Sequence, residues 1–255
     1  MVYYIHSSAF SVSVPNGEGC LFLEAAMQTQ KKIFSTELAY LLGILTIALG
    51  AACMTRADFG LSMVVAPAYI FHLKLSETLP FFSFGMAEYC LQAVLLLLMV
   101  VVLRKFRVSY IFSFVTAVLY GLALDMFLAI LGLLPDPGMV QRILFYLAGL
   151  IFCALGVSLV FHTYIAPEVY ELLVKEVAGK YGWNINKVKT AYDCISCVVS
   201  VLLSFAFFGL WHFEGVKLGT LICAPINGWM IGRCTHLMEK RWEFKDTWNL
   251  RRFFI

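Results

Sequence analysis

The sequence predicts an all-α integral membrane protein: six transmembrane helices forming two inverted three-helix repeats, each with a broken amphipathic or re-entrant segment. Three observations support this fold class, namely the composition, six long apolar stretches and an internal repeat. Hydrophobic residues make up 61% of the 255 residues and charged residues only 14%, with a mean hydropathy of +0.84. A soluble domain has about 45–50% apolar residues. This chain has too few polar residues to cover a core, so we expect it in a lipid bilayer.

The N-terminal segment, residues 1–36, precedes the first apolar stretch. Residues 1–26 lack a basic region followed by a long apolar run, so they do not resemble a signal peptide. Met27 opens the sequence MQTQKKIF, which has the character of a cytoplasmic start. We therefore expect native translation to begin at Met27.

Six stretches are long enough for transmembrane helices, which need about 20 mostly apolar residues. They are residues 37–55, 81–103, 108–134, 140–162, 188–210 and 216–238. The last is the weakest, because Pro225, Asn227 and Arg233 interrupt it. Residues 56–80 are also apolar, but glycine and proline break them. This pattern favours a re-entrant or interfacial helix over a seventh span.

The basic residues indicate the orientation, because cytoplasmic loops carry an excess of lysine and arginine. Basic residues precede span one, separate spans two and three and spans four and five, and follow span six: Lys31, Lys32, Arg104, Lys105, Arg107, Lys175, Lys180, Lys187, Lys189, Lys240, Arg241, Arg251 and Arg252. With six spans these segments fall on one side. Both termini are therefore predicted to be cytoplasmic, with residues 239–255 forming a cytoplasmic tail along the inner leaflet.

An internal repeat relates residues 37–134 to residues 140–238. The sequence YLLGILTIALG, from Tyr40, returns as YLAGLIFCALG, from Tyr146, with six identities in eleven positions. Further along, AEYCLQAVLLLLM resembles AYDCISCVVSVLL at a nearly constant offset. Because each half holds an odd number of spans, the halves must have opposite orientations, as in many secondary transporters. A chance match between apolar helices is the alternative.

Glycine pairs on the repeated helices predict close helix packing, since small residues let membrane helices approach each other. Spans one and four each carry two glycines seven residues apart: Gly43 and Gly50, and Gly149 and Gly156. We expect these two spans to cross in contact. The G-x-x-x-G pairs Gly215/Gly219 and Gly228/Gly232 are likewise expected to be packing contacts.

Four stretches resemble the YczE/YitT-like family of bacterial multi-pass membrane proteins: YDCISCVVSVLLSFAFFG, GVKLGTLICAPINGWMIG, FSFGMAEYCLQ and YGLALDMF. The similarity covers about residues 37–238, and its most specific parts are Asp193, the Gly219-Thr220 step and Asp125. The resemblance implies a protein of the bacterial cytoplasmic membrane. The activity of that family is poorly defined, so the resemblance implies no substrate and no catalytic residue.

Span five carries a polar stripe in which Lys189, Asp193, Cys197 (with Ser196 beside it), Ser200 and Ser204 recur about every fourth residue. Such residues lie on one face of a helix. Lipid cannot hydrogen-bond to them, so the stripe should face the bundle interior or a water-filled cavity. Lys189 and Asp193 have the spacing of an ion pair. Asp193 is either a structural tie between helices or a carboxylate coupled to an ion or substrate.

Other polar residues within the spans are binding candidates because ionisable groups are costly there. Glu88 and Gln92 lie four residues apart on span two, Asp125 lies on span three, and Asn227 lies where span six is most easily opened. The candidates for substrate or ion binding are Asp193, Lys189, Ser196, Ser200, Glu88, Gln92, Asp125 and Asn227. At the outer end of span one, Arg56 and Asp58 are expected to form a local ion pair, with a gate as the alternative.

We expect no metal ion, redox centre or other cofactor, and no enzymatic activity. Cys194 and Cys197 could supply two ligands, but a zinc site needs about four. The sequence has no nucleotide-binding or zinc-protease motif and no paired nucleophile and base. The net charge of +3 is too small to suggest a nucleic-acid partner.

The sequence therefore predicts a small-solute transporter or permease with a polar interior site at the repeat interface. The alternative is a non-transporting accessory or regulatory membrane protein that supports another pathway. The expected partners are the bilayer and a small solute, and association into a homo-oligomer is compatible with the pattern.

Overall fold

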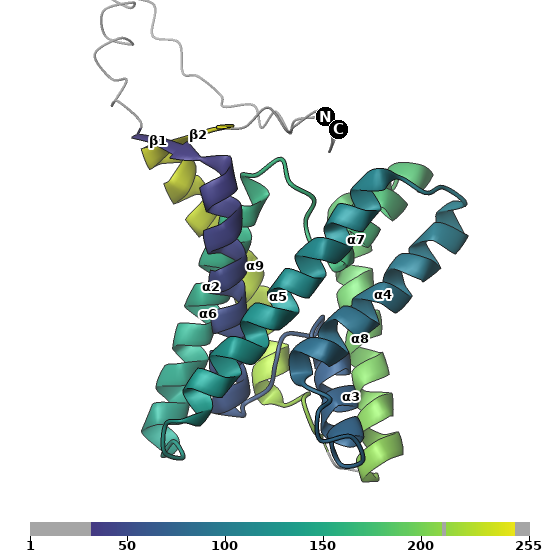
Figure 1. Ribbon diagram of the computed structural model, residues 1–255, viewed down its shortest axis with the longest axis vertical. Helices are drawn as coiled ribbons and strands as arrows, with labels where there is room; N and C mark the ends of the chain where they lie inside the picture. The colour runs from purple at the N-terminus through teal and green to yellow at the C-terminus, as the bar shows by residue number, and fades with distance from the viewer. Residues whose placement is uncertain (1–31, 211–212, 248–255) are drawn as a thin grey trace, which may run out of the picture.

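The computed structural model describes residues 32–210 and 213–247, which form eight helices and two short strands (Figure 1). The helices are α2 (Thr36–Ala57), α3 (Ala66–Ser76), α4 (Phe84–Leu103), α5 (Val108–Gly132), α6 (Met139–Phe161), α7 (Val169–Tyr181), α8 (Ile185–Phe208) and α9 (Leu218–Arg241). The strands are β1 (Lys32–Ser35) and β2 (Trp242–Lys245). The predicted start at Met27 lies outside the described residues.

Five of the described helices, α2, α4, α5, α6 and α8, are long and apolar enough to cross a membrane. The all-α membrane architecture is therefore supported, and five of the six predicted spans have a matching helix. The sixth, α9, has 24 residues but falls short in hydropathy, because its second half carries charged and imidazole side chains. A six-span topology stays a prediction.

Two helices are too short to span a bilayer. α3 has 11 residues and α7 has 13. At 1.5 Å per residue they are about 17 and 20 Å long, against a hydrocarbon core of about 30 Å. α3 begins at an Ala-Pro step, as expected for a break within residues 56–80, and α7 follows a second Ala-Pro step. They lie toward opposite ends of the molecule (Figure 1).

α2 and α6 form the centre of the molecule and touch through their backbones, so the predicted glycine contact is confirmed. A Cβ atom on Gly50 would lie 2.9 Å from the Gly149 carbonyl oxygen, and one on Gly156 would lie 2.7 Å from that of Gly43. No larger residue fits such an approach unchanged. The packing predicted for Gly228 and Gly232 is wrong for the described part of the chain, because no atom there lies within 4 Å of a Cβ built on either.

The remaining helices pack in pairs around this centre. α5 packs on α2 and α9 packs on α6, while α3 and α7 each contact both α4 and α8. The main apolar core includes Met54, Phe84, Tyr120 and Leu124. A smaller core near the other end of α4 joins Met99 and Leu103 to residues of α5 and α7. α3 and α7 are thus held by helices from both halves of the sequence.

The two ends of the described chain meet at one end of the bundle (Figure 1). β1 pairs with β2 in parallel, with Lys32 opposite Trp242 and Ser35 opposite Lys245. The tail, expected to lie along the membrane, thus begins as a strand bound to the N-terminal segment. Both ends lie on the same side, and the assignment of that side to the cytoplasm stays a prediction.

Candidate functional site

Polar side chains from α4 and from the start of α7 form the first candidate site, and all are buried except Glu168, which is half-buried. We name Glu88, Gln92, Glu168 and Tyr170 the carboxylate cluster. Glu88 and Gln92 are fully buried and lie one turn apart on α4. The Tyr170 hydroxyl donates to Glu88 Oε2 at 2.7 Å, and Gln92 Nε2 donates to Glu168 Oε2 at 3.4 Å. The cluster therefore connects the two halves of the chain.

The local sequence explains why α7 begins here. Glu168 is the N-cap residue of α7, but its carboxylate makes no capping hydrogen bond to the helix. The backbone N–H of Val169 instead donates to Gln92 Oε1 at 3.1 Å. The first N–H groups of a helix have no partner within the helix. A side chain of α4 therefore satisfies the start of α7, which fixes the position of Glu168.

The surroundings favour the neutral form of Glu168. Burial raises the pKa of its carboxyl to about 8, and the nearby Glu171 carboxylate adds to the shift. The hydrogen bond from Gln92 and the charge of Lys189 act in the opposite direction. Burial also raises the pKa of Glu171, again opposed by Lys189. Glu168 can thus exchange a proton near neutral pH.

Two atoms at this site have no hydrogen-bond partner in the described structure: Glu88 Oε1 and the Tyr120 hydroxyl oxygen. Both side chains are at most 1% exposed. Tyr120 lies on α5, and its electrostatic neighbours are Glu88 and Glu168. Buried polar groups without a partner are rare in folded proteins, and each calls for an explanation such as a water or an ion.

The polar stripe of α8 faces inward, as predicted. Ser196, Ser200 and Ser204 are buried, and the Ser200 hydroxyl donates to the Ser196 carbonyl at 2.8 Å. The predicted ion pair is also present, with Lys189 Nζ 3.3 Å from Asp193 Oδ1. Both residues stay partly exposed. The role of this stripe in binding stays a prediction.

Asp125 and Asn227 do not join the carboxylate cluster through any hydrogen bond between described residues. Asp125 accepts from the Ser83 hydroxyl at 2.5 Å and from the Gly85 N–H at 2.7 Å. A carboxylate is favourable at a helix N-terminus, so Asp125 ties α5 to the start of α4. Asn227 is half-buried on α9, and its Oδ1 is buried without a partner in the described part.

Sequence reasoning missed Glu168, Tyr170 and Glu171. The candidates were chosen as polar residues within the predicted spans, and these three residues lie between two spans. A signal was present, since Glu168 follows the second Ala-Pro step and opens an amphipathic segment. Their burial depends on α4 and α8, which lie far away in the sequence.

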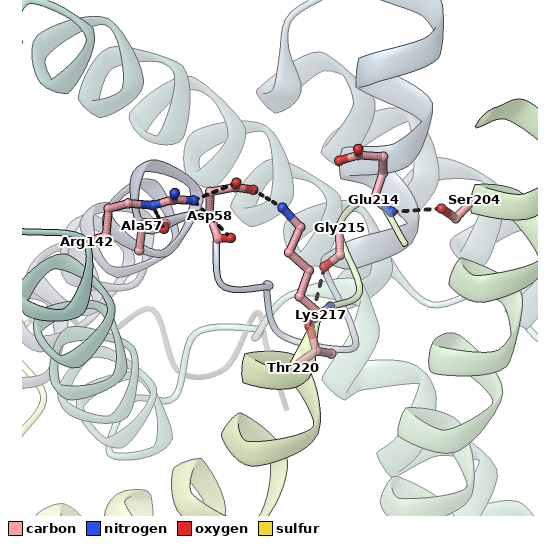
Figure 2. A network of polar contacts seen from close by, with 8 residues as sticks. All are labelled: Ala57, Asp58, Arg142, Ser204, Glu214, Gly215, Lys217 and Thr220. Carbon is pink, nitrogen blue, oxygen red and sulfur yellow. Dashed lines mark hydrogen bonds and ion pairs between the residues drawn. The ribbon is translucent and has the colours of Figure 1, made fainter. Parts of the chain in front are cut away.

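A second polar site lies where α2 ends and where α6 and α9 begin (Figure 2). We name Asp58, Arg142 and Lys217 the Asp58 network. Arg142 Nη2 lies 2.7 Å from Asp58 Oδ2, and Lys217 Nζ lies 2.5 Å from Asp58 Oδ1. Arg142 Nε also donates to the Ala57 carbonyl at 2.8 Å. Figure 2 shows Asp58 between the two basic side chains.

The expected local ion pair between Arg56 and Asp58 is therefore wrong. Asp58 has a left-handed backbone conformation with φ 56°, which ends α2 and directs its side chain toward α6 and α9. Arg56 instead donates to the Leu134 and Pro135 carbonyls and lies 3.5 Å from Asp136. The partners of Arg56 and Asp58 lie far away in the sequence, so the spacing of charged residues could not predict them.

Backbone hydrogen bonds reinforce the Asp58 network. The Gly219 N–H donates to the Phe59 carbonyl at 2.9 Å, and the Leu61 N–H donates to the Gly215 carbonyl at 3.2 Å. The Glu214 N–H donates to the Ser204 hydroxyl at 2.9 Å, which connects the end of α8 (Figure 2). The loop after α2 is thus bound to the segment before α9.

A pocket of about 450 Å³ opens beside the Asp58 network. Its lining combines leucines with both signs of charge: Thr55, Arg56, Asp58, Leu128, Leu131, Gly132, Asp136, Pro137 and Arg142. The described residues contain no group of three or more histidine, cysteine, aspartate or glutamate side chains that could hold a metal ion.

Comparison with protein families shows a match to a family of unknown function (DUF6198) over residues 34–236. Neither the curated proteins nor the solved structures gave a match.

Proposed function

The chain belongs to the DUF6198 family of unknown function, so we propose its function from its own geometry. We propose that it is a multi-pass membrane transporter of small solutes, built from two inverted three-helix repeats. Its binding site is the carboxylate cluster. The closer resemblance to YczE/YitT-like proteins stays a prediction. The observation that carries the proposal is that the first half supplies Glu88 and Gln92 while the second supplies Glu168 and Tyr170.

Helix packing supports the inverted repeat. We compare the two halves by replacing α2, α3, α4 and α5 with α6, α7, α8 and α9, respectively. Under this exchange the contact between α2 and α5 becomes the contact between α6 and α9, and the contact between α3 and α8 becomes the contact between α7 and α4. The α3–α4 contact likewise becomes the α7–α8 contact. The α2–α6 contact maps onto itself. The short helices of the two halves lie toward opposite ends (Figure 1), as an inverted pair would.

Equivalent side chains also make equivalent contacts. Tyr40 and Tyr146 each open one copy of the repeated motif. The Tyr40 hydroxyl hydrogen-bonds to the Thr116 hydroxyl of α5 at 2.6 Å, and the Tyr146 hydroxyl donates to the Gly219 carbonyl of α9 at 2.6 Å. Each tyrosine thus connects the first helix of its half to the last. These matching polar contacts favour a duplication over a chance similarity between apolar helices.

The position of the cluster suits a transporter. In inverted-repeat transporters, sites lie at the repeat interface and at the ends of broken helices. Here the cluster lies at the start of a short helix, between helices from both halves. α8 adds its buried serines and the Lys189–Asp193 pair nearby. The site is polar and mainly acidic, which favours a small solute bearing hydroxyl, amide or cationic groups.

Alternating access can be tested without knowing the solute. Ser196 is 7% exposed, whereas neighbouring Ile195 is 63% exposed. We would place Ser196→Cys in a background lacking the eight native cysteines and treat right-side-out and inside-out vesicles with a membrane-impermeant thiol reagent. Transport predicts labelling from both sides. The matched control, Ile195→Cys, should face lipid and react from neither side.

Labelling of Ser196→Cys from one side only, or from neither, contradicts alternating access. A partner protein that co-purifies with such a chain would then favour the accessory role. Confirmed two-sided access would justify current measurements on proteoliposomes with a panel of polar solutes. In that assay we expect Gln92→Leu to remove the current and Glu176→Gln to preserve it, because Glu176 contacts Arg107 and Tyr110 away from the cluster.

A further inference from the structure

We propose that the carboxylate cluster carries one exchangeable proton, held between Glu168 and Glu88, and that this proton is the ion coupled to transport. The coupling rests on the proposed function. The proton site itself is a property of the folded chain and can be measured without any transport.

The first argument is that the described residues place no unpaired cation at the cluster. Glu88 accepts a hydrogen bond from Tyr170 and Glu168 accepts one from Gln92, and both donors are neutral. The nearby cation, Lys189, is already paired with Asp193. Glu88 is fully buried and Glu168 is half-buried, and a carboxylate withdrawn from water without a cationic partner is unfavourable. Two such carboxylates near each other also repel, so at least one proton stabilises the pair.

The second argument is independent and comes from the atoms without a partner. Glu88 Oε1 and the Tyr120 hydroxyl are fully buried and unpaired in the described structure. A protonated carboxyl is a donor as well as an acceptor. A proton that moves onto Glu88 therefore gives its free oxygen a hydrogen to donate, with the Tyr120 hydroxyl as a neighbouring acceptor. The orphaned atoms thus mark where the proton would be accommodated.

A proton fits this site better than a metal ion. A bound metal cation needs several oxygen ligands arranged around it at once. The fully buried atoms of the cluster include one free carboxylate oxygen and one free hydroxyl, and the described ranges contain no group of three or more histidine, cysteine, aspartate or glutamate side chains that could hold a metal ion. A proton needs no such cage. It binds as COO⁻ + H⁺ → COOH and leaves to water when the site opens.

The groups that face Glu168 come from six helices. They are Tyr170 and Glu171 on α7, Glu88 on α4, Lys189 on α8, Tyr40 on α2, Tyr120 on α5 and Cys153 on α6. Among these described groups, Lys189 is the one base, and Glu88 and Glu171 are the carboxylic acids. Together with burial, this balance raises the pKa of Glu168 to about 8. A carboxyl with such a pKa can both bind and release a proton at physiological pH.

Infrared spectroscopy of the purified full chain in lipid nanodiscs tests the proton directly. We expect a protonated-carboxyl C=O band that disappears with a midpoint near pH 8 as the pH rises. Glu168→Gln should remove this band. Glu176→Gln is the matched control. Glu176 lies on α7, the helix that Glu168 caps, but it is paired with Arg107, so this variant should leave the band unchanged.

Two further variants shift the midpoint in opposite directions and do not depend on removing the titrating group. Glu171→Gln removes a negative charge that favours the proton, so the midpoint should fall. Lys189→Met removes a positive charge that opposes the proton, so the midpoint should rise. Shifts in these two directions support the assignment even if Glu168→Gln folds poorly.

The proposal is overturned if no carboxyl stays protonated above about pH 6, or if Glu168→Gln leaves the band and its midpoint near pH 8 unchanged. It is also overturned if sodium chloride, but not choline chloride, removes the band at fixed pH, because a metal cation would then occupy the site. Failure of the vesicle-labelling experiment would leave the band in place. The two hypotheses therefore fail separately.

Discussion

Individual residues at the two polar sites take their roles from partners distant in the sequence. Glu168 lies in a connecting segment, yet its protonation depends first on its burial in the fold and then on the charges of α7 and α8 and on Gln92 of α4. Asp58 follows an apolar helix, yet it pairs with Arg142 and Lys217, which lie 84 and 159 residues away. The fold therefore determines the chemistry of these residues. We derive one prediction from Glu168 and another from Asp58.

The protonation of Glu168 predicts a pH-dependent stability. Its folded pKa, about 8, is above its unfolded value of 4.5, so between these values the folded state binds more protons. Its contribution to the free energy of unfolding is therefore fully present below about pH 4.5 and is lost as pH rises through about 8. Melting temperatures of the purified chain should fall over this window. Glu168→Gln should flatten the fall, and an unchanged slope in this variant would contradict the burial of an ionisable Glu168.

The backbone of Asp58 predicts a difference between two truncations. Asp58→Ala and Asp58→Gly both remove partly exposed ion pairs, each contributing about 0–1 kcal/mol. Only Ala keeps a Cβ atom in the left-handed conformation, which costs about 1 kcal/mol. Asp58→Gly should therefore be more stable than Asp58→Ala by about 1 kcal/mol in thermal unfolding. Equal stability of the two variants would show that the ion pairs, and not the backbone, govern this turn.

At the scale of elements, apolar length predicted most of the helices. The span predicted at residues 37–55 corresponds to Thr36–Ala57, and that at 188–210 to Ile185–Phe208. The glycine spacing correctly predicted the contact between α2 and α6. The positions of α3 and α7 could not be predicted, because these short helices are held by contacts with α4 and α8 and not by their own hydropathy. The sequence predicted two of the four residues of the carboxylate cluster, Glu88 and Gln92, and did not predict Glu168 and Tyr170.

The close approach of α2 and α6 predicts unequal effects of adding one methyl group. In Gly50→Ala the new Cβ would lie 2.6 Å from Cys153 Sγ and 2.8 Å from its backbone nitrogen. Such overpacking costs about 1–3 kcal/mol. Gly228→Ala on α9 meets nothing within 4 Å among the described residues and should be neutral or stabilising by about 0.5–1 kcal/mol. Thermal unfolding in one detergent compares the two, and similar losses in both would contradict the contact.

At the scale of the whole molecule, the helix contacts match only in part when the two halves of the sequence are exchanged. α4 also packs extensively on α5, and the described residues of α8 and α9 make no equally extensive contact. The carboxylate cluster is asymmetric too, since the start of α3 holds Ala68 where α7 begins after Glu168. One half therefore supplies the acidic short helix, so the two faces of the bundle are chemically different.

The shared position of the two chain ends predicts the topology. β1 and β2 pair, so reporter fusions after Lys105 and after Ile255 should give the same cytoplasmic signal. A fusion inserted after Asp136, in the connection between α5 and α6, should report the opposite side. A matching signal from all three positions would contradict the inverted arrangement.

The pairing of β1 with β2 also orders the events of biosynthesis. β1 leaves the ribosome before α2–α9, and β2 leaves only after α9 has been made. Throughout synthesis β1 is therefore a strand edge without its partner, and exposed edges promote wrong associations. Only a polypeptide that extends through Lys245 can close the pair, so a product truncated before Trp242 keeps this edge open. The strand pair thus distinguishes chains that include β2 from chains that end before it.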